Sequence, residues 1–196
     1  MWVSTELTVD MVVRAYSRGI FPMAADVQEI FTWHRPDPRG VLPLDGFHCS
    51  RSLAKVVRQG RFEVTYDRAF RQVMEGCADR EEGTWINERL LAVYCELHSL
   101  GLAHSVEVWQ GENLAGGTYG VSLGGAFMAE SKFHRARDAS KVALAKLVER
   151  LKARGFVLLD VQYLTPHLAR FGVIEIPARE YERRLARALV LERTFG

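Results

Sequence analysis

A strand near the C-terminal end limits the possible folds more than any other part of the chain. Residues 156–162 read Phe-Val-Leu-Leu-Asp-Val-Gln, after Gly155 and before Thr165-Pro166. Apolar and β-branched residues between turn-forming residues predict a buried strand. Because side chains alternate across a strand, Asp160 and Gln162 point to the same face. A carboxylate beside an amide suits a site that handles an amine; an equally simple interpretation is that both are hydrogen-bonded into a loop.

The segments around this strand predict a mixed sheet. Three alternating segments and a long amphipathic helix precede it, and a helix, a strand and a last helix follow. In order, these segments are the strands 103–110, 114–123 and 126–132, the helix from Asp138 to Arg154, the helix 166–171, the strand 173–176 and the helix 178–191. The order predicts an α+β fold with a mixed α/β sheet, and its meander–helix–strand core resembles the N-acetyltransferase type of acyltransferase fold.

The beginning of the chain predicts a small N-terminal domain, residues 1–38. Thr8 is expected to cap a helix over residues 9–17, which Gly19 ends. Residues 19–40 are expected to be loop-rich, because prolines at positions 36 and 38 interrupt regular structure. Residues 39–196 then form an acetyltransferase-like catalytic domain, which begins with a short strand near residues 41–44.

The next helix carries a basic face. Ser50 is expected to cap it and Gly60 to end it, and Arg51, Lys55 and Arg58 fall on one side. This side is either a solvated helix surface or a stripe that follows nucleic-acid phosphates.

Two further helices are predicted before the meander. After a strand over residues 62–66, Asp67 is expected to cap a helix that ends at Ala78. Residues 80–86 predict a loop. Asn87 then begins a helix with Tyr94 on its apolar face, where a partly buried core tyrosine is the simplest interpretation.

Composition excludes several classes of protein. A net charge of +2 in 196 residues means that a nucleic-acid-binding role requires local clustering of charge. No apolar run reaches membrane-spanning length, and Glu6 and Asp10 interrupt any signal-peptide pattern. Three separated cysteines predict reduced thiols. We therefore expect a cytoplasmic protein that acts away from membranes.

Motif searches leave transfer chemistry without a cofactor. A coenzyme A enzyme of this type is expected to have a glycine-rich turn before the long helix, but residues 130–140 contain no glycine. The chain has no Gly-x-Ser-x-Gly elbow, no P-loop and no dinucleotide fingerprint. Its six histidines are dispersed without zinc-site spacing. The sequence predicts no metal and no organic cofactor.

An ordered set of motifs resembles the leucyl/phenylalanyl-tRNA–protein transferase family and extends from about residue 12 to residue 181. The motifs are Gly19-Ile20-Phe21-Pro22, Pro36-Asp37-Pro38-Arg39, Ser50-Arg51-Ser52, Glu81-Glu82-Gly83-Thr84-Trp85-Ile86, Ala103-His104-Ser105-Val106-Glu107-Val108-Trp109, Gly116-Gly117-x-Tyr119-Gly120-Val121, Glu130-Ser131, Ala139-Ser140-Lys141 and Leu159-Asp160-x-Gln162. Each motif is weak by itself, whereas their common order is specific.

The resemblance implies an enzyme that moves leucine or phenylalanine from aminoacyl-tRNA to the N-terminal amine of a protein beginning with Arg or Lys, which marks that protein for degradation. It implies that Asp160 holds the incoming amine and helps to remove its proton. Gln162 would orient the amine or donate to the oxyanion, and Glu130 would face the cationic acceptor. We expect a monomer.

The resemblance also implies substrate-binding and tRNA-binding residues. The substrate-binding set is Tyr94, Trp85, Thr118, Phe127 and Met23. The basic face of Arg51, Lys55 and Arg58 would bind tRNA.

Some positions depart from the family pattern. Met23 and His34 stand where the family usually has tryptophan, and Thr118 and Lys132 stand where it commonly has apolar residues. Two alternatives therefore stay open. One is a related aminoacyl-tRNA-dependent peptide-bond former with a different donor or acceptor, and the other is a tRNA-binding module without activity.

Overall fold

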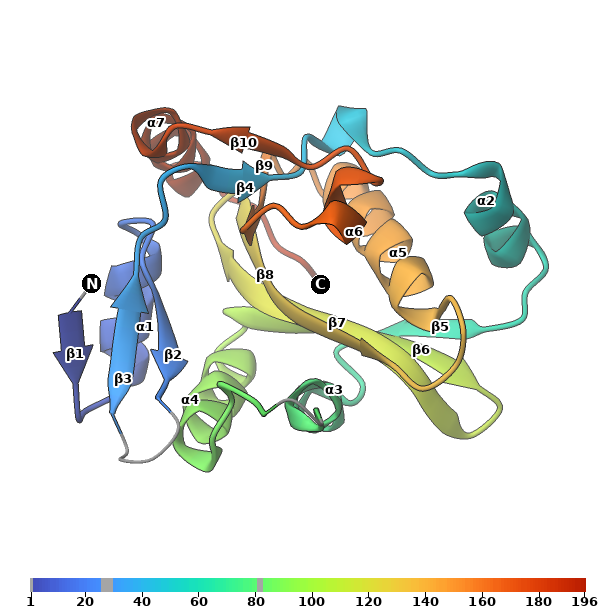
Figure 1. Cartoon of the computed structure of the whole chain (residues 1–196), viewed down its shortest axis with the longest axis horizontal. Coiled ribbons are helices and arrows are strands. Elements are labelled where there is room, and N and C mark those ends of the chain that lie inside the picture. The colour runs from blue at the N-terminus through green and yellow to red at the C-terminus, as the bar shows by residue number, and fades with distance from the viewer. Residues whose placement is uncertain (1, 26–29, 81–82) are drawn as a thin grey trace.

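A seven-stranded sheet forms the centre of the computed structural model, which describes residues 2–25, 30–80 and 83–196 (Figure 1). The strand order is β10-β4-β9-β8-β7-β6-β5. The strands are β4 (Arg39–Val41), β5 (Glu63–Tyr66), β6 (Ala103–Gln110), β7 (Asn113–Leu123), β8 (Ala126–His134), β9 (Leu158–Gln162) and β10 (Ile174–Ile176). β8 and β9 pair in parallel and the other neighbours pair antiparallel. This arrangement confirms the predicted α+β fold with a mixed sheet.

Helices cover both faces of this sheet (Figure 1). The helices are α2 (Arg51–Arg58), α3 (Phe70–Ala78), α4 (Glu88–Ser99), α5 (Ala139–Ala153), α6 (Pro166–Ala169) and α7 (Ala178–Leu189), with a short 3-10 helix η1 (Leu44–Gly46). The alternation of strand side chains divides the core between the two faces. Met128 joins the cluster beneath α3 and α4, whereas its neighbour Phe127 joins the cluster beneath α5 and α2.

The N-terminal segment forms a second sheet. It contains β1 (Trp2–Ser4), α1 (Val9–Tyr16), β2 (Phe21–Ala24) and β3 (Phe31–His34), with strand order β1-β3-β2. The expectation of a loop-rich segment over residues 19–40 is therefore wrong. The prolines at 36 and 38 lie beyond β3, and Pro22 is tolerated because β2 is an edge strand.

The two sheets share one hydrophobic cluster. Tyr16, Phe31 and Trp33 from the N-terminal segment belong to the same cluster as Tyr94 and Met128. The first sheet lies within residues 2–34 and the second within residues 39–176. The two units therefore do not have separate cores. The division into separate domains at residue 38 stays a prediction.

The predicted helix caps are confirmed at three residues that directly precede their own helices. The side chains of Thr8, Ser50 and Asn87 accept hydrogen bonds from the backbone N–H three residues later, as predicted. Asp67 does not cap its helix, whose N-cap residue is Ala69, so that prediction is wrong. Asp138 is the N-cap residue of α5, as predicted, but its side chain makes no capping hydrogen bond. Both have left-handed backbone conformations, with φ of 59° and 72°, and their carboxylates turn to other partners.

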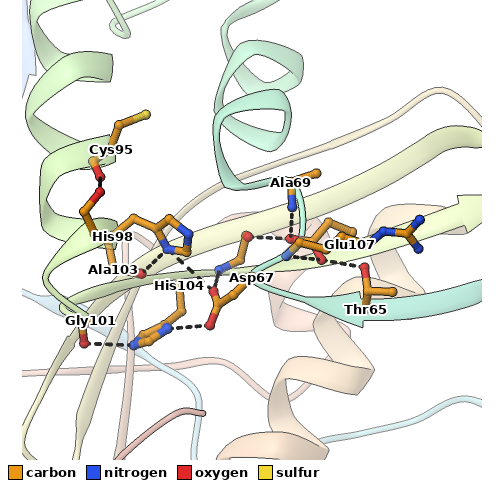
Figure 2. A network of polar contacts seen from close by, with 12 residues as sticks. Thr65, Asp67, Ala69, Cys95, His98, Gly101, Ala103, His104 and Glu107 are labelled. Atoms are coloured by element: carbon orange, nitrogen blue, oxygen red, sulfur yellow. Dashed lines mark hydrogen bonds and ion pairs between the residues drawn. The ribbon is translucent and has the colours of Figure 1, made fainter.

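A neighbouring strand supplies the missing cap of α3 (Figure 2). Asp67 accepts hydrogen bonds from His104 Nδ1 at 2.8 Å and from the backbone N–H of Ser105 at 2.9 Å. The fully buried Glu107 of β6 accepts a hydrogen bond from the N–H of Ala69, where α3 begins. A tertiary contact therefore satisfies the end of a helix that the local sequence leaves uncapped.

Two smaller differences concern the position of a strand and the burial of a tyrosine. The strand expected near residues 41–44 is β4, which begins at Arg39. Tyr94 is fully buried rather than partly buried. Glu81 and Glu82 of the predicted loop and motif lie outside the described residues.

In the part of the chain that the structure describes, no helix combines the length and apolar character that crossing a bilayer requires.

Replacing Glu107 with alanine should lower the free energy of unfolding by about 2–4 kcal/mol, because the hydroxyls of Thr65 and Ser105 lose their buried acceptor. Urea denaturation measures this change. Glu112→Ala, at an exposed position of the β6–β7 turn, is the control and should change stability by less than about 0.5 kcal/mol. Equal stability of the two variants would contradict the capping role.

Candidate active site

A buried ion pair between Arg39 and Asp160 lies at the centre of the site. Arg39 Nε and Nη2 donate to the two oxygens of Asp160 at 2.9 and 2.6 Å. Tyr181 donates its hydroxyl to Asp160 Oδ2 at 2.8 Å, and the backbone N–H of Gln162 donates to Oδ1 at 2.9 Å. Four donors therefore satisfy a carboxylate whose side chain is 0% exposed.

The guanidinium of Arg39 joins four parts of the chain. Its Nη1 donates to the carbonyl oxygen of Gly19 at 2.9 Å, and its Cζ atom lies over the rings of Phe21 and Tyr181, 5.0 and 4.5 Å from their centroids. Burial by itself lowers the pKa of Arg39, but the adjacent Asp160 carboxylate reverses that effect and raises the pKa above its ordinary value. The ion pair therefore holds the N-terminal segment, β4, β9 and α7 together.

The hydrogen bonds of Asp160 bear on the role predicted for it. Both carboxylate oxygens already accept hydrogen bonds, and the side chain is fully buried. One of these bonds holds the backbone of Gln162 in place. The role of Asp160 in receiving the amine stays a prediction.

Gln162 and Glu130 meet where two strands are distorted. Gln162 Nε2 donates to Glu130 Oε1 at 2.8 Å. Glu130 is the additional residue of a bulge in β8, and Gln162 follows a bulge in β9. Bulges redirect side chains and are frequent beside active sites. Gln162 also has a φ of 60°, a strained conformation for a residue other than glycine.

Gly40 allows the strand β4 to approach this distorted segment. A Cβ atom at Gly40 would lie 2.8 Å from the carbonyl carbon of Tyr163, a distance that normal contacts exclude. The glycine next to Arg39 is therefore required for the close packing of β4 against the end of β9.

The surroundings of Glu130 favour its neutral form. Burial raises its pKa to about 8, and the negative charge of Asp160 acts in the same direction, whereas a hydrogen bond with Tyr16 and the charge of Arg39 oppose the increase. Tyr16 in turn shares a 2.6 Å hydrogen bond with Tyr94. Polar groups thus connect the core tyrosines through Glu130 to Gln162.

Two cavities include Glu130 in their lining. An aromatic cavity of about 90 Å³ is lined by Phe21, Met23, Trp85, Glu130, Gln162 and Tyr163. A cleft of about 760 Å³ is lined by Glu130, Ser131 and Lys132 of β8 together with residues from the beginning of α5 and from α6. The structure therefore brings four predicted residues, Met23, Trp85, Glu130 and Gln162, to one small cavity.

The other predicted substrate-binding residues lie outside the cavities. Tyr94 is buried behind Tyr16, and the Thr118 hydroxyl donates to the carbonyl oxygen of Ser131 at 2.8 Å. Phe127 stacks on Phe195 in the core beneath α5. Their roles in binding stay predictions, and their observed contacts are structural.

The predicted basic face of α2 is exposed. Arg51, Lys55 and Arg58 point to solvent from a helix whose Leu53 packs in the core. This arrangement is compatible with both a solvated surface and a phosphate-binding stripe.

One histidine cluster has spacing that metal binding would allow. Single ligand atoms of Asp67, His98 and His104 lie within 4.8 Å of one another (Figure 2). The ring nitrogens, however, face oxygen acceptors: His98 Nδ1 lies 2.8 Å from the carbonyl of Ala103, and His104 Nε2 lies 3.1 Å from that of Gly101. His98 Nδ1 and the two ring nitrogens of His104 each face an oxygen atom of the protein, so we interpret the cluster as a structural hydrogen-bond network.

Sequence reasoning missed Arg39, Tyr181 and Tyr16 as parts of the site. Arg39 had one detectable signal, since it follows a proline and directly precedes the apolar residues of β4. A charge at the beginning of a buried strand requires a buried partner. The partner itself is 121 positions away in the sequence, which local patterns do not reveal.

Comparison with known proteins identifies the class of protein as an acyltransferase that uses aminoacyl-tRNA. A family model described as leucyl/phenylalanyl-tRNA protein transferase matches residues 41–186, and the model of its N-terminal domain matches residues 5–37. The chain belongs to the leucyl/phenylalanyl-tRNA–protein transferase family. This confirms the resemblance found in the sequence.

Named relatives of that family are similar over nearly the full chain. The transferase of Salinibacter ruber is 55% identical over 94% of this chain and 81% of its own length. That of Herpetosiphon aurantiacus is 50% identical over 98% of this chain and 100% of its own. Among solved structures, L-PGS from Bacillus licheniformis aligns with a TM-score of 0.45 and 11% identity, over 90% of this chain and 62% of that chain.

Removing the cation from the central ion pair should be strongly destabilising. Arg39→Ala leaves the buried Asp160 carboxylate uncompensated, and we expect the free energy of unfolding to decrease by about 3–5 kcal/mol. Arg14→Ala, which breaks the exposed pair with Asp10, is the control and should cost less than about 1 kcal/mol. Similar urea midpoints for the two variants would show that the buried pair is not essential to the fold.

The raised pKa of Glu130 predicts a pH dependence of stability. The folded state keeps this proton up to about pH 8, whereas the unfolded chain releases it near 4.5. The stabilisation is therefore complete below pH 4.5 and is lost as pH rises towards 8. Glu130→Gln removes this titration. The free energy of unfolding of Glu130→Gln minus that of wild type should therefore increase as the pH rises from 4.5 to 8. A difference that is constant with pH would contradict the raised pKa of Glu130.

Proposed function

We propose that this protein transfers leucine or phenylalanine from aminoacyl-tRNA to the N-terminal amine of proteins that begin with Arg or Lys, and so marks them for degradation. The observation that carries this proposal is the hydrogen-bonded Glu130–Gln162 pair in a member of this transferase family; both residues line an aromatic cavity, and Glu130 also lines a larger cleft. We further propose that it acts in the cytoplasm as a monomer.

The reaction needs positioning more than strong acid–base catalysis. The donor is an ester, and the α-amino group has an ordinary pKa near 8, so much of it is neutral at cellular pH. The amine nitrogen attacks the ester carbonyl carbon; a C–N bond forms, the C–O bond to the terminal ribose breaks, and a proton passes from nitrogen to the leaving hydroxyl. Alignment of the two reactants and stabilisation of the oxyanion supply the rate enhancement.

Gln162 is the residue we assign to the reacting groups. Its Nε2 atom donates to Glu130, and its Oε1 atom accepts no hydrogen bond from the described residues. That oxygen would accept a hydrogen bond from the attacking amine and direct its lone pair at the ester. Asp160 would act through the backbone of Gln162, by keeping it in its strained conformation.

Glu130 is the residue we assign to the acceptor. Its carboxyl is mainly neutral at pH 7, and an approaching cation favours the carboxylate and lowers the pKa. A cationic N-terminal residue would therefore bind together with the release of a proton. This coupling supports the preference for acceptors that begin with Arg or Lys.

The aromatic cavity is suited to the apolar part of the donor. Phe21, Met23, Trp85 and Tyr163 form its walls next to the reacting pair. The alternative of a different donor or acceptor is favoured by one observation, the cationic Lys132 in the cleft beside Glu130.

A transfer assay tests the proposal. The protein is incubated with Phe-tRNA or Leu-tRNA and with peptides that begin with Arg, Lys, Asp or Met. We expect product only with the Arg and Lys peptides. Transfer to the other peptides would support the alternative acceptor range, and tRNA binding without transfer would overturn the proposed activity.

Gln162→Ala should lower kcat about 100-fold, because the attacking amine loses its hydrogen-bond acceptor. The KM for Phe-tRNA should change little, since this residue acts on the attacking group. Gln110→Ala, at the exposed end of β6, is the control. An unchanged kcat in Gln162→Ala would remove Gln162 from the mechanism.

A further inference from the structure

Two neighbouring cavities share part of their lining, and one of them includes Glu130. The 760 Å³ cleft beside Glu130 and a neighbouring cavity of about 330 Å³ share four lining residues. These are Arg137, Asp138, Lys141 and His167. The second cavity ends at Ser50 and Ser52, where the helix α2 with its basic face begins. We call these two adjacent cavities together the cationic trough.

Positive charge is concentrated in this trough. Its lining contains six cationic side chains, Arg80, Lys132, Arg135, Arg137, Lys141 and Arg170, and two acidic ones, Glu130 and Asp138. The whole chain has a net charge of only +2. The lining is thus more positive than the whole protein, and the remainder of the chain is net negative. This is the local clustering that a weakly charged nucleic-acid-binding protein requires.

The charges of the trough are only partly neutralised within the protein. Asp138 accepts a 2.7 Å contact from Lys141. Among the residues that the structure describes, Lys132, Arg135 and Arg170 form no ion pair. These cations are therefore available to an external anion.

Mutual repulsion of these groups lowers the pKa of two of them. Burial lowers the pKa of His167, and the nearby charges of Lys132, Lys141 and Arg170 lower it further. The pKa of Lys132 is lowered by its burial and by Arg80. Like charges held close together raise the energy of the unbound site, and a polyanion that enters the trough relieves this repulsion.

We propose that the cationic trough binds the phosphodiester chain of the tRNA's single-stranded 3′ end. The chain would pass from α2 across the trough and present its terminal ester at Glu130 and Gln162. This inference rests on the proposed function and adds a path to it. An RNA tail fits better than an acidic peptide, because its charges recur at every nucleotide and the trough connects a basic helix with the reacting pair.

The paired variant Arg135→Gln/Arg170→Gln tests the path, because it removes one unpaired cation from each cavity. The control is Arg154→Gln/Arg187→Gln, which removes the same charge from exposed positions outside the trough. Two donors are compared in transfer to an Arg peptide: full-length Phe-tRNA, and phenylalanyl-adenosine, which has no phosphodiester chain.

For Phe-tRNA we expect the KM of the trough variant to rise about 10-fold and the slope of log KM against log salt concentration to fall by about 1.4, which corresponds to two lost single-strand contacts. The KM for phenylalanyl-adenosine should match that of the control variant. An equal KM for Phe-tRNA in both variants would overturn the path. A higher KM for the Arg peptide alone would assign the trough to the acceptor and also overturn it.

Direct binding separates this inference from the proposed activity. Fluorescence anisotropy with labelled Phe-tRNA measures the affinity of the protein for the RNA without any transfer reaction. If wild type transfers no amino acid but the trough variant still binds Phe-tRNA about 10-fold more weakly than the control, the proposed function fails and the trough stands. Transfer by wild type with equal binding by both variants gives the opposite conclusion.

Discussion

The buried contact between Arg39 and Asp160 is the interaction on which the rest of the site depends. Removing both charges from water is costly, and the cost is offset only where every hydrogen-bonding position is used. Here the carboxylate has four donors, and the guanidinium adds a carbonyl acceptor and two aromatic rings. The pair fixes β9 relative to β4 and therefore fixes Gln162.

Two bulges then distort a regular sheet at the proposed reacting site. The bulge at Glu130 and the bulge before Gln162 lie where the two side chains meet at 2.8 Å, in the lining of the aromatic cavity. The strained backbone at Gln162 persists because Asp160 and the close approach of Gly40 hold it in place. A reaction that already has an activated ester requires this kind of fixed placement more than a strong base.

The N-terminal segment contributes directly to the site even though it forms its own sheet. Gly19 accepts from Arg39, Phe21 and Met23 line the aromatic cavity, and Tyr16 lies beside Glu130. The shared hydrophobic cluster supports these contacts. The aromatic cavity and the cationic trough share Glu130 in their lining.

The sequence by itself determined the features that depend on neighbouring residues. The caps at Thr8, Ser50 and Asn87, the meander, the long helix and the buried strand follow from local hydrogen bonding and hydrophobic periodicity. The ordered motifs determined the family. Short strands such as β2 and β3 escaped prediction, because pairing with each other stabilises them more than their composition does.

Only the tertiary structure decided which of the predicted residues meet. It placed Asp160 behind the reacting pair because a partner 121 residues away satisfies its charge, and it gave α3 a cap from a neighbouring strand. It also gathered dispersed basic residues along one trough. Burial, charge compensation and cavity shape arise from contacts between distant segments, and a linear pattern contains no direct record of those contacts.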